Sequence, residues 1–121
     1  MGLKSYLAGI KGEELAEQYL SPRGYQIIER KFHSQQGEID LVAKDQDVLA
    51  FVEVKNYSFR SFGSPLGAVR KSKRQSIIHA ARTYLYKKAV ANTFCRFDVL
   101  IIYRDRCNRL AVELYKDAFK C

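Results

Sequence analysis

Two β-prone runs decide the fold of this chain: E-I-D-L-V-A-K at residues 38–44 and V-L-A-F-V-E-V-K at residues 48–55. The three residues between them are polar and typical of a tight turn, so the runs predict a β-hairpin. Side chains alternate between the two faces of a strand, which puts Glu53 and Lys55 on one face. A two-residue turn would set Asp40 opposite Glu53 on that same face.

The rest of the chain predicts a single α/β domain over residues 1–121. Its elements follow in the order α-β-β-β-α-β-β, for which we expect a central mixed sheet flanked by helices. Besides the hairpin, we expect a helix from Ser5 to about Leu20, a strand over Tyr25 to Phe32, a long helix from about Leu66 to Lys88 opened by Pro65, and strands over Arg96 to Tyr103 and Leu110 to Tyr115.

Charge indicates the class of partner. Twenty-one Lys and Arg residues against thirteen Asp and Glu residues give a net charge of +8, as in proteins that bind polyanions such as nucleic acids, although an inert basic surface has the same composition. No apolar run is long enough to span a membrane, and charged residues follow the N-terminus too soon for a signal peptide. We therefore expect a cytoplasmic protein with no membrane partner.

The acids of the hairpin suggest a metal site. Asp40, Glu53 and Lys55 lie near the middle of an otherwise apolar hairpin, where charged groups are costly unless they are paired or bound to a metal. Two carboxylates can hold Mg²⁺ or Mn²⁺, and a neighbouring lysine can orient an attacking water or stabilise a phosphoryl transition state. Taken alone, the three residues could equally form a cross-strand ion pair on a solvated sheet face.

The combination of motifs resembles a known family. The matching stretches are Gly12-Glu13, Gly37-Glu38-Ile39-Asp40-Leu41, Phe51-Val52-Glu53-Val54-Lys55, Phe62-Gly63, Lys73 and Arg96-Phe97-Asp98-Val99. They resemble the YraN-like uncharacterised proteins, which belong with the restriction-endonuclease-like nucleases and lie close to archaeal Holliday-junction resolvases. The resemblance implies a restriction-endonuclease-like core with Asp40 and Glu53 as metal ligands, Lys55 as catalytic lysine, and Glu13 as a further catalytic acid. Helix geometry alone would also allow Glu13 to lie in water.

Several basic residues are candidates for binding nucleic acid. Lys73 falls at the centre of the apolar stripe of the long helix, so its ammonium must either snorkel to solvent or point along the sheet to the carboxylates or a phosphate. Arg70 borders the same stripe and is either a phosphate contact or a solvated flank. The other candidates are Arg60, Lys71 and Arg74.

Two further features have alternative interpretations. The segment Asn56 to Phe62 mixes aromatic, hydroxyl and basic residues, which can stack on unpaired bases or simply close the core. Asp98 follows the basic Arg96 on one strand face, and we expect it to form an ion pair or a strand-end hydrogen bond.

These observations favour a metal-dependent DNA phosphodiesterase. By the resemblance, its substrates extend to branched or recombining DNA, which suits a homodimer with two-fold symmetry. The alternative function is a nucleic-acid-binding module with the same fold and no catalysis.

Overall fold

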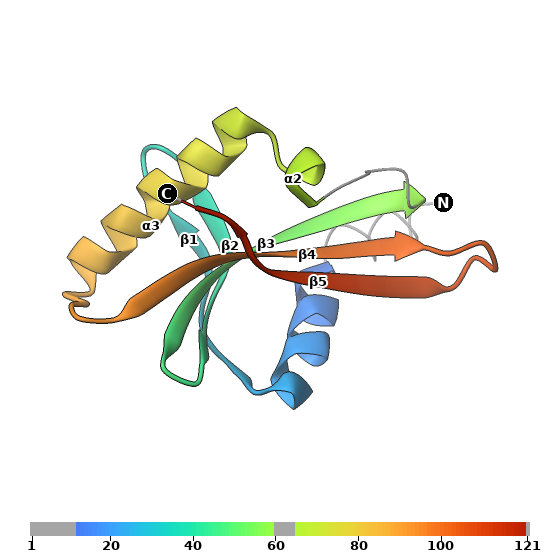
Figure 1. Ribbon diagram of the computed structural model, residues 1–121, viewed down its shortest axis with the longest axis horizontal. Coiled ribbons are helices and arrows are strands. Elements are labelled where there is room, and N and C mark those ends of the chain that lie inside the picture. The colour runs from blue at the N-terminus through green and yellow to red at the C-terminus, as the bar shows by residue number, and fades with distance from the viewer. Residues whose placement is uncertain (1–11, 60–64, 121) are drawn as a thin grey trace.

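A computed structural model describes residues 12–59 and 65–120 of the chain, without the side chains of residues 58, 59, 65 and 66. A five-stranded mixed sheet forms the centre, with helices on both of its faces (Figure 1). After a helix over residues 12–20, the elements are the 3₁₀ turn η1 (Ser21–Arg23), β1 (Tyr25–His33), β2 (Glu38–Asp45), β3 (Val48–Phe59), α2 (Pro65–Ala68), α3 (Lys71–Lys87), β4 (Phe94–Arg104) and β5 (Leu110–Phe119).

The strands lie in the sheet in their order along the chain. Neighbouring strands are antiparallel except β3 and β4, which run parallel because α2 and α3 carry the chain back between them. This architecture confirms the predicted α/β class, the α-β-β-β-α-β-β order and the match to a restriction-endonuclease-like core.

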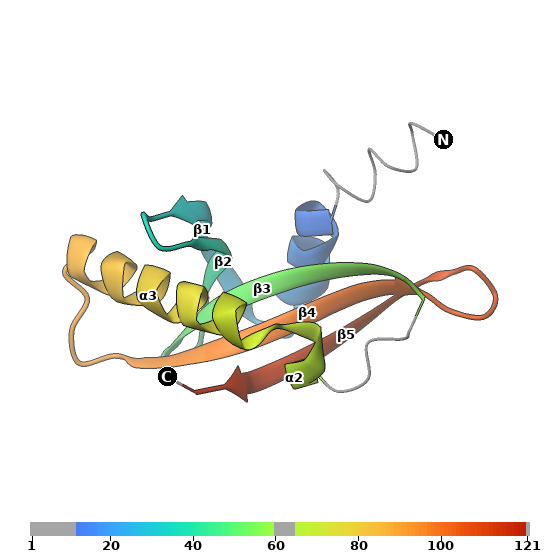
Figure 2. The same ribbon diagram turned by 90° about the horizontal axis from the view of Figure 1, so that it is seen from above.

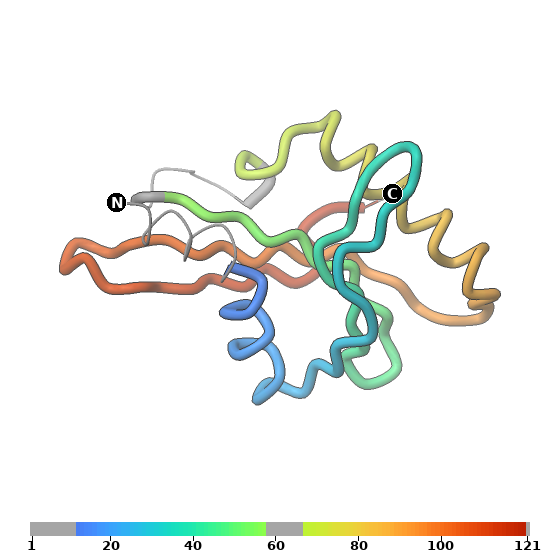
Figure 3. The backbone as a smooth tube through the Cα atoms, turned by 180° about the vertical axis from the view of Figure 1, so that it is seen from behind, coloured from blue at the N-terminus to red at the C-terminus, as the bar shows by residue number. Residues whose placement is uncertain are grey.

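The two faces of the sheet are buried by different helices. Figure 2 shows α3 crossing one face, and Figure 3, drawn from behind, shows the helix of residues 12–20 on the other. On the α3 side, Tyr84 packs edge-on against Phe32 and Phe51. On the opposite side, Ala16 and Leu20 are buried against the sheet. The strands are therefore apolar on both faces, and a charged side chain near their centre loses most of its contact with water.

The hairpin has the register that the sequence predicts. Its ladder runs from Asp45↔Val48 at a two-residue turn to Leu41↔Val52, and one further step in this register brings Asp40 opposite Glu53. Gln46 in the turn has a φ of 56°, the left-handed conformation that such turns require. The same register extended further would also set Glu38 opposite Lys55, but the β2–β3 ladder ends at Leu41↔Val52, and Glu38 pairs instead with His33 of β1.

Several predicted boundaries were wrong, among them that of β5, which runs to Phe119 and does not end at Tyr115. The long helix expected from Leu66 to Lys88 is interrupted, because Arg70 has an extended backbone with φ −62° and ψ 152°. The Arg74 guanidinium donates to the carbonyl oxygen of Val69 at 2.8 Å, which satisfies an acceptor freed by the break, and Val69 itself is buried. The segment after Lys55 was expected to be irregular, but β3 continues to Phe59 because β4 pairs with it.

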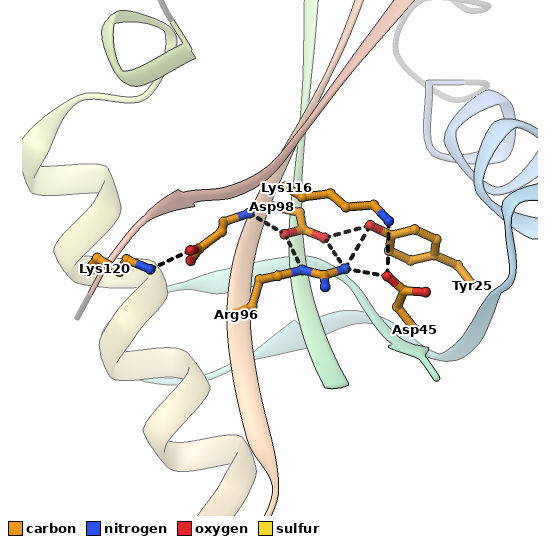
Figure 4. Close-up of polar contacts among 7 residues, drawn as sticks. Tyr25, Asp45, Arg96, Asp98, Lys116 and Lys120 are labelled. Atoms are coloured by element: carbon orange, nitrogen blue, oxygen red, sulfur yellow. Dashed lines mark hydrogen bonds and ion pairs between the residues drawn. The ribbon is translucent and has the colours of Figure 1, made fainter. Parts of the chain in front are cut away.

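Asp98 has the structural role expected of it. It is completely buried on β4, where Arg96 donates to both carboxylate oxygens at 2.8 and 3.1 Å and the Tyr25 hydroxyl donates at 2.8 Å. Arg96 also donates to Asp45 at the end of the hairpin, and Lys116 of β5 reaches the same carboxylate (Figure 4). This polar network ties the start of β1 to the hairpin, β4 and β5.

Candidate functional site

Asp40 lies where β2 and β3 separate. Its Oδ2 accepts a hydrogen bond at 2.8 Å from the backbone N–H of Val54, one residue beyond the last pair of the ladder. The side of the sheet on which β2 residues are buried changes at the same point. Ile39 and Val42 pack in the core under α3, whereas Leu41 packs in the core on the opposite face. Because the hydrogen bond occupies one carboxylate oxygen and fixes the side chain, the other oxygen is held in a defined position beside Glu53.

Glu53 is the most perturbed acid of the site. Its side chain is only 4% exposed and follows the buried Phe51 on the same face of β3. Burial, together with the hydrogen bond and negative charge of Asp40, raises the pKa of Glu53 to about 8, while Lys73 and Lys55 act in the opposite direction. Beside Asp40, Glu53 therefore does not easily become charged at neutral pH.

Two lysines from different elements flank Glu53. Lys55, two residues along β3, has its Nζ 3.6 Å from Glu53 Oε2, and Lys73 Nζ from the first turn of α3 lies 3.8 Å from the same atom. Of the two orientations that the sequence left open for Lys73, the structure has the one in which the ammonium points to the carboxylates. Both side chains are partly exposed, so one flank of the acid pair is cationic and open to solvent.

Glu13 lies beside a different lysine. Its Oε1 is 3.2 Å from Lys31 Nζ. In the β1–β2 ladder Phe32 pairs with Ile39, so the preceding residue, Lys31, neighbours Asp40. Hydrogen bonding and charge from Glu13, with smaller contributions from Glu38 and Asp40, raise the pKa of Lys31. The Oε2 of Glu13 is buried without a hydrogen-bond partner among the described residues. Glu13 is thus linked to Asp40 through Lys31.

Asp40 and Glu53 together offer two carboxylate ligands, which fits an ion of the magnesium type. Within residues 12–59 and 65–120, no group of three or more acidic, histidine or cysteine side chains is arranged to hold a metal ion, so Glu13 does not complete a three-acid site. Magnesium, however, is usually bound by one or two carboxylates together with waters and phosphate. Burial is the largest cause of the raised pKa of Glu53, and the neighbouring Asp40 adds to it; a divalent cation between the two acids would favour their charged forms.

An open groove of about 730 Å³ adjoins the acid pair. It passes between β3 and the junction of α2 with α3. Its lining consists of three cations, two serines, one tyrosine and two small residues, namely Lys55, Arg70, Lys73, Ser72, Ser76, Tyr57, Gly67 and Ala68. Among the residues that the structure describes, no carboxylate lines the groove, which makes it suited to an anionic ligand that approaches Glu53 from the lysine side.

The other predicted basic residues are distributed unevenly around this groove. Arg70 lines it and is exposed, and Lys71 is exposed on the first turn of α3. Arg74 is only half-exposed, and its guanidinium is engaged with the Val69 carbonyl, which gives it a structural task. Arg60 lies outside the described residues.

Sequence reasoning missed Lys31 and the two groove serines. Lys31 meets Glu13 only after the helix of residues 12–20 has packed beside β1, and no local spacing connects the two residues. Ser72 and Ser76 are one turn apart on α3, a repeat that could have marked a polar strip next to Lys73.

Gly37 holds the first motif close to α3. A Cβ added at Gly37 would lie 2.8 Å from the carbonyl oxygen of Ser76, so only glycine permits this approach. Figure 3 shows the β1–β2 turn reaching α3, and hydrogen bonds between Ser34 and Gly37 close that turn. The glycine of the G-E-I-D stretch therefore helps to fix α3, with Lys73, over the acid pair.

Comparison with known proteins places the chain in a family. The model of the uncharacterised protein family UPF0102 matches residues 12–102. The UPF0102 protein of Desulfosudis oleivorans is 43% identical over 111 residues, covering 92% of this chain and 88% of the relative. That of Clostridium perfringens strain 13 is 38% identical over 113 residues, with 93% of each chain covered, and that of Hahella chejuensis is 38% identical over 119 residues, with 98% and 94% covered.

The chain therefore belongs to the UPF0102 family, the YraN-like proteins. In the part of the chain that the structure describes, no helix combines the length and apolar character needed to cross a membrane.

Proposed function

We propose that this protein is a magnesium- or manganese-dependent phosphodiesterase that cleaves DNA in the cytoplasm. The observation that carries the proposal is the buried Glu53, which shares its site with Asp40 and faces two lysine ammoniums on the side of a cationic groove. A purely structural ion pair would need one cation for one carboxylate and no adjoining groove. The arrangement instead supports the proposal that a metal, a phosphate and a nucleophile would bind at separate places in this site.

Asp40 and Glu53 would hold the metal ion, which when bound lowers the pKa of a water molecule and neutralises charge on the phosphate. The hydrogen bond from Val54 keeps the Asp40 carboxylate oriented for this task. Lys55 is positioned to hold a water by its Nζ and to stabilise negative charge that develops on the phosphoryl oxygens. Lys73 and Arg70 would bind and orient the DNA strand through its phosphates.

Branched DNA is part of the same proposal. Two copies related by a two-fold axis would present two such sites to a junction with two equivalent strands. The net charge of +8 supports attraction to the dense phosphates of such a substrate.

The decisive experiment is a cleavage assay on labelled linear and branched DNA with magnesium, manganese or chelator. We expect cleavage only with a divalent metal, and we expect Lys55→Ala to abolish it while DNA binding persists, because one lysine among many adds little to affinity. Lys44→Ala, which removes an exposed lysine of β2 away from the groove, is the matched control and should cleave normally. Cleavage that resists chelation, or full activity of Lys55→Ala, would contradict the mechanism. Metal-independent binding with no cleavage of any substrate would instead support the non-catalytic binding module.

A further inference from the structure

The groove beside Glu53 differs from a generally basic surface in its composition and size. Lys55 and Lys73 lie at its acid-pair end, and Arg70 lies at the N-terminal boundary of α3. Among the described residues, Tyr57 adds an aromatic ring to its lining. The Tyr57 side chain is half-buried and packs against the hydrophobic core, and its hydroxyl donates to the carbonyl oxygen of Ala68 at 3.2 Å, so the ring is fixed at the edge of the groove.

We propose that this groove binds an unpaired strand of DNA, with phosphates on Arg70 and Lys73 and a base against Tyr57. The inference rests on the proposed function, because it names the form of substrate that reaches the acid pair. Cations that follow a backbone, combined with an aromatic platform, are the features by which proteins bind single strands without reading their sequence.

The dimensions of the groove favour one strand over a duplex. Its volume of about 730 Å³ lies within the range of pockets that enclose small ligands, so it is suited to a few nucleotides. Bases in a duplex are stacked and paired, and a base can enter a pocket of this kind only after it has been unpaired. Gly67 and Ala68 add no bulky side chain to the lining.

The position of the groove would bring a bound unpaired strand next to the acid pair. Lys55 and Lys73 both line the groove and both contact Glu53, so a strand bound there would pass directly beside the acid pair. DNA with a fork, flap or branch point would then be preferred, because it offers unpaired nucleotides next to a duplex that the rest of the basic surface can hold.

Binding measurements with chelator present test this inference separately from catalysis. Fluorescence anisotropy would compare a labelled single strand, the blunt duplex of the same sequence and a forked duplex. We expect the wild type to bind the single strand and the fork more tightly than the blunt duplex. Tyr57→Leu should weaken single-strand binding roughly tenfold, the loss of one stacked base, with little effect on the duplex. Tyr57→Phe loses the hydrogen bond to Ala68 but keeps the ring, and it should bind the single strand more tightly than Tyr57→Leu; unchanged duplex binding by Tyr57→Leu controls for its folding.

Arg70→Ala should weaken single-strand and fork binding and lower the dependence on salt by about one released counterion. Arg106→Ala removes an equally exposed arginine from the turn between β4 and β5 and should leave the preference for unpaired DNA unchanged. Equal affinity of the wild type for the single strand and the duplex would overturn the inference, as would equal losses in Arg70→Ala and Arg106→Ala. If the preference holds but no substrate is ever cleaved, the groove assignment stands and the proposed nuclease function fails.

Discussion

The Asp40 carboxylate of β2 accepts a hydrogen bond at 2.8 Å from the backbone N–H of Val54 of β3. This side-chain hydrogen bond replaces the backbone pairing of β3 where the two strands separate. The hydrogen bond explains how a carboxylate can be held beside the buried Glu53 despite their repulsion. It also means that the site contains both a stabilising contact and an unfavourable one. Metal-free stability should respond to the balance between them.

The first prediction therefore concerns Asp40→Asn. The amide oxygen can still accept the Val54 N–H, while the charge that raises the pKa of Glu53 is lost, so we expect metal-free stability to be unchanged or higher by up to about 1 kcal/mol. Added magnesium at about a hundred times its Kd should stabilise the wild type by about 2.7 kcal/mol and should not stabilise the variant. Thermal melts in chelator and in excess metal measure both effects.

The structure also modifies the charge balance on which this prediction depends. The sequence suggested three acids facing one lysine, but Lys31, Lys55 and Lys73 all lie among the acids. Burial of Glu53, reinforced by the hydrogen bond and charge of Asp40, nevertheless outweighs the two nearby ammoniums, so the pKa of Glu53 stays raised. A variant that melts far lower in chelator, combined with a wild type indifferent to metal, would show that Asp40 serves only the fold.

The second prediction is a pH dependence of stability without metal. The pKa of Glu53 is raised from 4.5 to about 8, so the folded protein retains a proton that the unfolded chain releases between these values. The contribution of Glu53 to the free energy of unfolding should consequently be highest below pH 4.5. It should fall as pH rises towards 8, by up to about 1.4 kcal/mol per pH unit. Urea denaturation from pH 5 to pH 8 in chelator provides the test. Glu53→Gln should have a flatter profile, and identical slopes in the two proteins would contradict the assignment.

The third prediction contrasts a buried ion pair with an exposed one. Arg96→Ala leaves the fully buried Asp98 without its cation and should destabilise the protein by about 3 kcal/mol or more. Arg30→Ala removes an exposed arginine that donates to both carboxylate oxygens of Glu17, and it should change stability little. Urea denaturation of both variants measures the difference. Similar losses would mean that the network shown in Figure 4 does not hold the strands together.

The fourth prediction concerns the basic surface as a whole. If DNA is bound mainly through its phosphates, log affinity should fall linearly with log salt, with a slope of about −0.9 for each duplex phosphate neutralised. Titrations of a blunt duplex at several salt concentrations would give the number of contacts. Affinity that hardly varies between low and moderate salt would point to a partner other than nucleic acid.

The sequence by itself determined the hairpin and its acid pair. Alternating side chains and a two-residue turn act locally, so E-I-D-L-V and F-V-E-V-K were enough to predict that Asp40 and Glu53 meet on one face. Helix periodicity likewise placed Lys73 on the apolar stripe of its helix, because the positions that share a face are set by the helix itself, but it left open where the ammonium points.

Only the tertiary structure decided what surrounds that pair. Lys31 and Glu13 are brought together by the packing of separate elements, and the break at Arg70 is stabilised by burial of Val69 and a hydrogen bond from Arg74. β3 extends to Phe59 because β4, more than thirty residues later, supplies its hydrogen bonds. Local patterns fix which face a side chain occupies, but the position of one element along another depends on the long-range packing of the whole core.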